Sequence, residues 1–144
     1  MKIMFICTGN ICRSAMADAM LKKKIKEENK PIEVYSCGIF AQNGDYPTNE
    51  AVEVMKEYGV DLSKHRATNI RNSKIEEMDV ILCATTAHKN NVLNMYPELE
   101  GKVYTMKEYA GYDKNDLDIK DPWGYDIDTY RRCAKEIDEC LKKM

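Results

Sequence analysis

The chain has 144 residues, 44% of them apolar and 32% charged, and this length and balance fit one folded domain, residues 1–144, with a single core. The formal net charge of −2 excludes a general attraction to nucleic acid or to an anionic membrane, so any affinity for phosphate must come from a local site. No apolar run is long enough for a signal peptide or for a membrane span of roughly 20 residues, and we therefore expect a soluble, cytoplasmic protein without nucleic-acid or membrane partners.

The first half of the chain alternates between predicted strands and helices. Residues 3–6 form a short apolar run typical of a buried strand, a glycine-containing loop follows, and the apolar spacing of residues 17–25 predicts a helix. Residues 32–36 predict a second strand, and the stretch 38–47, rich in Gly, Asn, Asp and Pro, predicts a loop. Thr48 is a suitable N-cap for the helix that comes next.

The second half continues this alternation. Residues 80–83 predict a third buried strand, and Thr86 begins a predicted helix that stops before Pro97. Residues 103–104 predict a short fourth strand. Residues 106–125 carry few apolar positions and predict a polar loop, whose length is typical of functional segments.

The C-terminal segment, residues 127–144, places its apolar side chains on one helical face and predicts an amphipathic helix that docks on a sheet. Strands that alternate with helices imply right-handed crossovers. We therefore predict an α/β fold of three layers, with a parallel sheet of about four strands and helices on both faces. Ligands bind at the carboxyl ends of the strands in such sheets, and Cys7 stands at one of these ends.

The loop after the first strand, Cys-Thr-Gly-Asn-Ile-Cys-Arg-Ser from Cys7 to Ser14, can hold an anion. Its N–H groups, the N-terminus of the following helix and the guanidinium of Arg13 would surround one sulfur with positive potential. Gly9 and Asn10 tolerate the left-handed backbone that turns successive N–H groups inward. We expect Cys7 to be a nucleophilic thiolate and the Arg13 guanidinium to donate hydrogen bonds to two phosphoryl oxygens. Ser14 can donate a hydrogen bond to the sulfur and cap the helix.

This loop resembles that of the low-molecular-weight protein-tyrosine phosphatases, which reads Cys-x-Gly-Asn-Ile-Cys-Arg-Ser near the N-terminus. The segment Ser36-Cys-Gly is similar to the family's Ser-Ala-Gly, residues 61–67 to its Asp-Leu-Ser-x-His-x-Ala, and Asp121-Pro to its late acid loop. The resemblance covers essentially the whole chain. It implies a phosphatase that acts on a phosphorylated protein substrate through a phosphocysteine intermediate, releases inorganic phosphate and uses no metal or other cofactor.

The same resemblance implies a role for each residue of the site. Cys7 is expected to be the nucleophile, Arg13 the phosphate clamp and Asp121 the general acid. The residues expected to bind the phosphate are Thr8, Gly9, Asn10, Ile11, Cys12 and Ser14. The residues expected to support the loop through hydrogen bonds are Asn10, Ser14, Ser36 and His65.

The chemistry independently calls for an acid, because the leaving group needs a proton and the phosphocysteine later needs a base to activate water. One carboxylate in a mobile loop can serve both steps. Asp121 stands out among the acidic residues near this loop because Pro122 restricts its backbone and Trp123 can screen it from water. We expect the other aspartates to be solvated: Asp113, Asp116, Asp118, Asp126 and Asp128.

Several other side chains have two interpretations. Phe40, Trp123 and Tyr125 lie in loops that would flank the pocket and could stack on a phenyl phosphate, although core packing is an alternative for Phe40. Cys12 could join Cys7 in a reversible disulfide, as the resemblance favours, or could be a small buried residue. His88 is expected at the surface. Packing is the default for the remaining cysteines, Cys37, Cys83, Cys133 and Cys140.

The choice of substrate depends on Ile11. A branched apolar side chain can pack on a phenyl ring, whereas the related protein-arginine phosphatases tend to have threonine here, so we predict phosphotyrosine, with phosphoarginine as the alternative.

Thioredoxin-coupled arsenate reductases share the loop but use two further cysteines at a set spacing. Cys83 could be the first, yet Asn90 occupies the place of the second. Phosphocysteine carrier domains of sugar transport lack the clamping arginine and need no general acid, which argues against that class.

Overall fold

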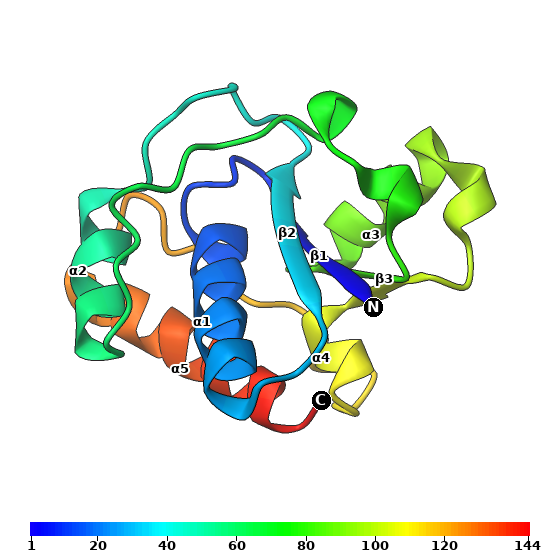
Figure 1. Ribbon diagram of the computed structural model, residues 1–144. Coiled ribbons are helices and arrows are strands. Elements are labelled where there is room, and N and C mark those ends of the chain that lie inside the picture. The colour runs from blue at the N-terminus through cyan, green and yellow to red at the C-terminus, as the bar shows by residue number, and fades with distance from the viewer.

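The computed structural model describes all 144 residues and has one four-stranded sheet with helices on both faces (Figure 1). The strand order is β2-β1-β3-β4, and every pairing is parallel. The predicted α/β fold with a parallel sheet of about four strands is confirmed. The strands are β1 (Lys2–Cys7), β2 (Glu33–Gly38), β3 (Val80–Cys83) and β4 (Val103–Thr105).

Alternate residues of β1 pack on opposite faces of the sheet, as the pleat requires. Ile3 and Phe5 join a core beneath three helices, whereas Met4 and Ile6 join a second core on the other face. The helices of the first face are α1 (Arg13–Glu28), α2 (Asn49–Glu57) and α5 (Ile127–Lys142). The second face is covered by α3 (Thr86–Met95) and by short 3-10 turns at Ile70–Asn72 and Ile75–Glu77.

Side-chain caps mark the starts of α2, α3 and α5. The predicted Thr48 cap is confirmed, because its hydroxyl accepts a hydrogen bond from the N–H of Ala51 at 3.3 Å. Helix α3 begins at the predicted residue, with Thr85 as its cap, and α5 begins after Asp126, whose carboxylate accepts from the N–H of Thr129 at 3.0 Å. None of the helices has both the length and the apolar character needed to cross a bilayer.

The prediction of an uninterrupted loop over residues 106–125 is wrong at its start, where a short helix, α4 (Met106–Tyr109), forms. The Thr105 hydroxyl accepts from the N–H of Glu108 at 2.9 Å, and the Glu108 carboxylate accepts from the N–H of Thr105 at 3.1 Å. This Thr-x-x-Glu capping box satisfies N–H groups that a helix start leaves free. The polar composition of the segment concealed that signal.

Two aspartates of the predicted acid loop, Asp116 and Asp118, anchor it to the rest of the fold while their side chains stay exposed to solvent, as expected. The Asp118 carboxylate accepts from the N–H of Thr86 at 2.7 Å, and Asp116 pairs with the buried Lys107 at 2.7 Å. Lys107 also pairs with Glu136 of α5 at 2.9 Å. Burial lowers the pKa of Lys107, but its hydrogen bonds to both carboxylates outweigh burial and raise the pKa to about 12. The loop is therefore fixed to α3, α4 and α5.

Candidate active site

The loop between β1 and α1 is held in shape by Asn10, which is fully buried and has a left-handed backbone with a φ of 57°. Its amide N–H groups donate to the hydroxyls of Ser14 at 2.8 Å and Ser36 at 3.0 Å. Its amide oxygen accepts from the N–H of Thr68 at 2.9 Å. Segments from α1, β2 and the region around Thr68 thus converge on one side chain.

Two further residues extend this support. Nε2 of His65 lies 2.7 Å from the main-chain oxygen of Asn10, and because a carbonyl only accepts, Nε2 carries a proton. The Ser36 hydroxyl donates to Oδ2 of Asp18, a buried carboxylate of α1, at 2.8 Å. The structure thus brings the four expected supports together and adds Asp18. The available signal for Asp18 was a lone acid among the apolar residues of that helix.

Cys7 ends β1 at the base of the loop, and its Sγ lies 2.9 Å from Oγ of Ser14. Both residues are buried. The expected contact between hydroxyl and sulfur is therefore present. The expectation that Ser14 caps α1 is wrong, because the cap position is Cys12, which makes no capping hydrogen bond, and Ser14 lies inside the first turn. No cap side chain competes with an anion for the N–H groups of that turn.

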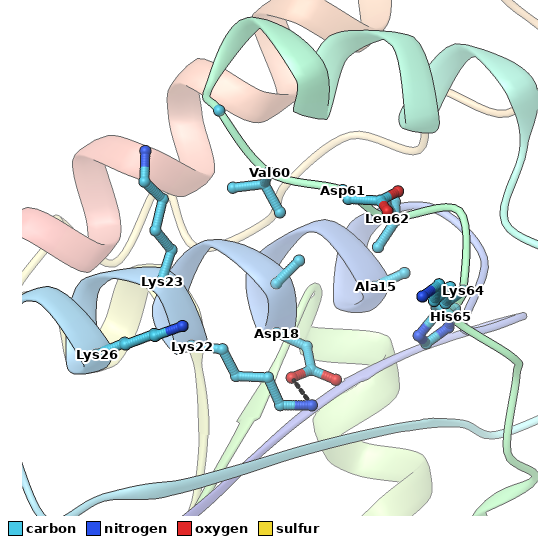
Figure 2. Close-up of a pocket in the computed structure, with 12 residues that line it drawn as sticks. Ala15, Asp18, Lys22, Lys23, Lys26, Val60, Asp61, Leu62, Lys64 and His65 are labelled. Atoms are coloured by element: carbon cyan, nitrogen blue, oxygen red, sulfur yellow. Dashed lines mark ion pairs between the residues drawn. The ribbon is translucent and has the colours of Figure 1, made fainter.

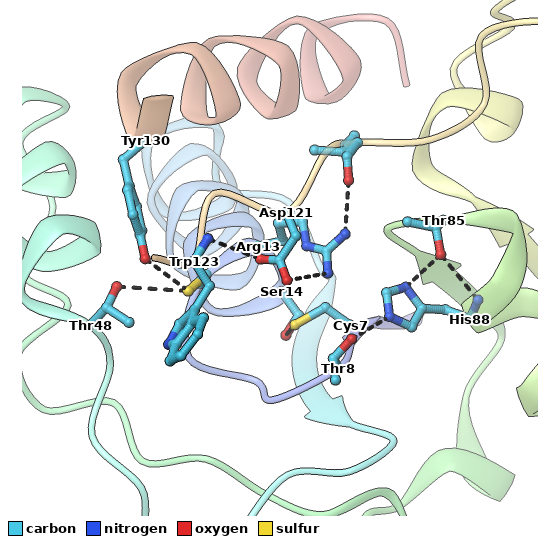
Figure 3. A network of polar contacts seen from close by, with 12 residues as sticks. Cys7, Thr8, Arg13, Ser14, Thr48, Thr85, His88, Asp121, Trp123 and Tyr130 are labelled. Atoms are coloured by element: carbon cyan, nitrogen blue, oxygen red, sulfur yellow. Dashed lines mark hydrogen bonds and ion pairs between the residues drawn. The ribbon is translucent and has the colours of Figure 1, made fainter. Parts of the chain in front are cut away.

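The buried guanidinium of Arg13 reaches from α1 to the acid loop (Figure 3). One terminal amino group donates to the main-chain oxygen of Ile119 at 2.8 Å, and the other lies 3.6 Å from Oδ2 of Asp121. Nε–H of Arg13 is buried and has no hydrogen-bond partner. A buried donor without an acceptor is costly, and a phosphoryl oxygen in the adjoining cavity would supply one.

Cys7, Arg13 and Asp121 line one cavity of about 330 Å³, which opens where β1 ends. Asn10 and Ser14 do not line it; their side chains lie behind the loop and shape it. The other residues of the cavity wall are Thr8, Gly9, Ile11, Cys12 and Trp123.

The aromatic side chains around the cavity differ from expectation. Trp123 lines the cavity but is 62% exposed, and the side chain of Asp121 is 52% exposed, so Trp123 does not screen the carboxylate from water. Phe40 is 76% exposed and is not among the residues that line the cavity, so the core alternative is wrong. Its main chain supports the loop instead, because the N–H of Phe40 donates to the oxygen of Thr8 at 3.0 Å. Tyr125 is also exposed and lies outside the cavity wall.

The family profile described as "Low molecular weight phosphotyrosine protein phosphatase" matches residues 2–144. The chain belongs to this family. Its members are cysteine-dependent phosphatases that act on phosphorylated proteins. The cavity with its buried cysteine and arginine is the part of the structure that fits this chemistry.

Relatives of this phosphatase carry names for different substrates. A low molecular weight protein tyrosine phosphatase from T. tengcongensis is 38% identical, with a TM-score of 0.90 over 100% of this chain and 99% of that chain. A mutant of YwlE arginine phosphatase with a phosphorylated active-site serine is 33% identical, with a TM-score of 0.91 over 99% of this chain and 92% of that chain. Arsenate reductase 2 of Staphylococcus haemolyticus is 34% identical over 142 residues, 99% of this chain and 94% of that protein.

Gly38, at the end of β2, leaves room for the loop from Cys7 to Ser14, called the phosphate loop below. A Cβ at Gly38 would lie 2.5 Å from the main-chain oxygen of Thr8 and 2.8 Å from the nitrogen of Asn10. Side-chain atoms do not approach backbone atoms so closely, so a residue other than glycine would displace the loop. The Ser-Cys-Gly segment marked this position in the sequence without indicating its role.

His88 is only 7% exposed, which corrects the expectation of a surface residue. Its Nε2 lies 2.8 Å from the hydroxyl of Thr8 in the phosphate loop, and its Nδ1 lies 2.9 Å from the hydroxyl of Thr85. Burial, followed by the nearby charge of Arg13, lowers the pKa of His88 to about 4. No local pattern predicts this contact, because α3 lacks a clear apolar stripe.

The six cysteines of the phosphatase are all buried and unpaired. Burial raises the pKa of Cys12 and Cys140 to about 11, raises that of Cys37 and Cys133 to about 12, and also raises that of Cys83. These five side chains belong to the two hydrophobic cores. Packing is therefore confirmed for the four cysteines outside the loop.

A larger cavity, of about 480 Å³, lies between α1 and residues 59–65 (Figure 2). Asp18 on its wall pairs with Lys22 at 2.9 Å, and further lysines surround it. This cavity touches the phosphate loop only through the supports Asp18 and His65, and it contains neither the cysteine nor the arginine of the loop. Size alone therefore does not locate the phosphatase chemistry.

Proposed function

We propose that this protein hydrolyses phosphotyrosine in phosphorylated proteins, with Cys7 as the nucleophile, and releases inorganic phosphate. The observation that carries the proposal is one cavity in which Cys7 adjoins Arg13, with its unpartnered Nε–H, and the carboxylate of Asp121. Cleavage of a phosphate ester through a cysteine needs a sulfur nucleophile, a guanidinium that binds the phosphoryl oxygens, and a proton donor.

In the first step the Cys7 thiolate attacks phosphorus, so that a P–S bond forms and the P–O bond to tyrosine breaks. The protonated carboxyl of Asp121 gives its proton to the leaving oxygen. The Arg13 guanidinium binds the phosphoryl oxygens as charge develops on them. The Ser14 hydroxyl, 2.9 Å from Sγ, can stabilise the thiolate before attack and again when it leaves.

In the second step Asp121, now a carboxylate, takes a proton from a water molecule whose oxygen attacks phosphorus. The P–S bond breaks, the Cys7 thiolate is restored and phosphate leaves. The half-exposed side chain of Asp121 is open to that water. The phosphorylated active-site serine of the YwlE mutant supports a covalent step of this kind.

Turnover of p-nitrophenyl phosphate by wild type and variants tests this mechanism. Cys7→Ser is expected to be folded and inactive, whereas Cys140→Ser, a change at a buried cysteine of α5, should retain activity. Rapid acid quenching of wild type with a ³²P-labelled ester should place the label on Cys7. Turnover by Cys7→Ser at the wild-type rate would show that the nucleophile is misassigned.

Phosphotyrosine is the proposed substrate because Ile11 and Trp123 both line the cavity, where an apolar branch and an indole face can pack on a phenyl ring. The similarity to YwlE arginine phosphatase supports phosphoarginine as the alternative. Peptides of one sequence that carry phosphotyrosine, phosphoarginine or phosphoserine separate the two. We expect the highest kcat/KM for phosphotyrosine and a shift toward phosphoarginine in Ile11→Thr. A higher kcat/KM for phosphoarginine in wild type would assign the arginine-phosphatase activity instead.

Arsenate reduction has less support, despite the similarity to arsenate reductase 2. Cys83 is fully buried in β3, and Asn90 on α3 has no thiol to continue a relay. Thioredoxin-supported arsenate reduction that is present in wild type and lost in Cys83→Ser would reverse this judgement.

Cys12 is proposed to protect Cys7 from irreversible oxidation. Hydrogen peroxide would oxidise the Cys7 thiolate to a sulfenic acid with release of hydroxide, and the Cys12 thiol would then form a disulfide with release of water. Wild type treated with peroxide should regain activity with dithiothreitol, whereas Cys12→Ala should not. Equal recovery of both proteins would leave Cys12 with a packing role, next to the Tyr130 hydroxyl at 3.3 Å.

A further inference from the structure

His88 connects helix α3 to the phosphate loop through two hydroxyl groups (Figure 3). Its ring is buried, with Thr85 at Nδ1 and Thr8 at Nε2, at 2.9 Å and 2.8 Å. None of these three side chains has a part in the two chemical steps proposed above. Their hydrogen atoms can nevertheless be assigned from the contacts that each oxygen makes.

The assignment starts at Thr85. Its hydroxyl oxygen already accepts a hydrogen bond from the N–H of His88 at 3.1 Å, as the cap of α3. The hydroxyl proton needs an acceptor of its own, and Nδ1 of His88 is the polar atom beside it. With the proton on Nδ1 instead, the Thr85 hydrogen would have no acceptor in the protein. Thr85 therefore donates, and Nδ1 carries no hydrogen.

The other ring nitrogen follows from the charge of the ring. Burial and the neighbouring Arg13 outweigh the attraction of Asp121 and Asp118, and they hold the pKa of His88 at about 4. At neutral pH the ring therefore has a single proton, which must be on Nε2. Nε2–H then donates to the hydroxyl oxygen of Thr8.

Thr8 is left with a free proton. Its oxygen accepts from His88, no protein acceptor lies within hydrogen-bond distance of its hydroxyl other than the ring, and Thr8 lines the cavity that Cys7 and Arg13 share. A hydroxyl whose oxygen is held by an imidazole N–H has its own hydrogen directed away from that ring. An anion in the cavity is a suitable acceptor for this hydrogen.

We propose that the hydroxyl of Thr8 donates a hydrogen bond to an oxygen of the bound phosphate group, and that His88 is the positioning residue that orients this donor. The proposal rests on the phosphatase function proposed above. It adds a side-chain donor to the N–H groups of the loop and the fork of Arg13. It also gives α3, which contributes no reacting group, a defined effect on phosphate binding.

Inhibition by inorganic phosphate measures this hydrogen bond directly. Thr8→Val preserves the shape of the side chain without the hydroxyl and should raise the inhibition constant at least tenfold, as expected for a bond to a charged acceptor. Thr8→Ser should restore most of the affinity. Thr129→Val, which removes a hydroxyl on the surface of α5, is the matched control and should bind phosphate like wild type.

The role of His88 is separated from a purely structural one by a double-mutant cycle. His88→Gln should raise the inhibition constant in wild type but add little in the Thr8→Val background, because the two changes remove one interaction. Independent effects of the two changes would overturn the positioning role. The folding of each variant is checked by urea unfolding.

Nitrogen-15 NMR of the wild-type histidine rings tests the assignment without any mutation that affects folding. The signals of His88 are identified by their absence in His88→Gln or, if that variant does not fold, by exclusion against those of His65. The Nε2–H tautomer is expected, and an Nδ1–H tautomer would overturn the proposal.

A wild type that hydrolyses p-nitrophenyl phosphate while Thr8→Val leaves phosphate inhibition unchanged would refute the proposed Thr8 donor alone. An inactive wild type would refute the phosphatase function, with the tautomer still measurable.

Discussion

Replacement of Asn10 tests whether one side chain holds the phosphate loop in shape. Its amide makes hydrogen bonds to Ser14, Ser36 and the N–H of Thr68, and its backbone is left-handed. Asn10→Gly removes the hydrogen bonds but accepts the backbone conformation without strain. Asn10→Ala removes the same bonds and adds the strain of a Cβ. The two variants therefore separate the bonds from the backbone.

The structure sets the expected loss of unfolding free energy. Each of the three lost hydrogen bonds costs about 1 kcal/mol, so we expect Asn10→Gly to lose about 3 kcal/mol. The hydroxyls of Ser14 and Ser36 keep partners in Cys7 and Asp18, which limits the loss. Asn10→Ala should lose about 1 kcal/mol more, because a left-handed backbone disfavours a residue with a Cβ.

Urea unfolding followed by circular dichroism measures both losses, and inhibition by phosphate reports the shape of the loop. Asn94→Ala, on an exposed part of α3, is the matched control and should unfold like wild type. Free energies within about 0.5 kcal/mol of wild type for both Asn10 variants would refute the reasoning, since changes of that size are typical of surface positions. Equal losses in the two variants would show that the left-handed backbone stores no strain.

Three further outcomes are expected. Asp121→Asn should slow hydrolysis of phenyl phosphate by about 100-fold but that of p-nitrophenyl phosphate far less, because p-nitrophenolate leaves without a proton; equal losses of kcat for the two esters would contradict its role as acid. Gly38→Ala should push the loop away from its place and raise the phosphate inhibition constant about tenfold or more, and unchanged inhibition would mean that the loop adapts. The pKa of His88 is lowered to about 4, so the unfolded chain binds this proton more tightly, and stability should fall as pH drops from about 6.5 to 4. His88→Gln should flatten that part of a stability profile measured by urea unfolding, and an unchanged profile would show that His88 does not titrate there.

The sheet could be predicted because its strands are short apolar runs with turn residues between them. The third strand has the predicted bounds, residues 80–83, and β1 contains the predicted run 3–6. Helix α4 was missed because its signal is a reciprocal hydrogen bond between Thr105 and Glu108 in a polar segment. The anchors of the acid loop were missed for a different reason. Lys107 pairs with Glu136, a residue that only the folded chain brings near.

That Cys7 and Arg13 lie together could be predicted because their residue types and their place after a strand are informative by themselves. Cys7 and Arg13 do share a cavity with Asp121. The direction of exposed aromatic side chains could not be predicted, because composition does not say whether a residue such as Phe40 points toward a pocket or into solvent. Supports such as His88 depend on partners from distant segments, which no local pattern shows.

Arg13 sets the distance between the phosphate loop and the acid loop through main-chain contacts. One of its amino groups donates a hydrogen bond to the main-chain oxygen of Ile119, two residues before Asp121. Ile119 is fully buried, and its N–H donates to the oxygen of Ala84, just after β3, at 2.9 Å. The position of the proposed acid is therefore fixed by the backbone that precedes it. Its side chain can remain half exposed and open to water while Arg13 and the sheet keep it beside the cavity.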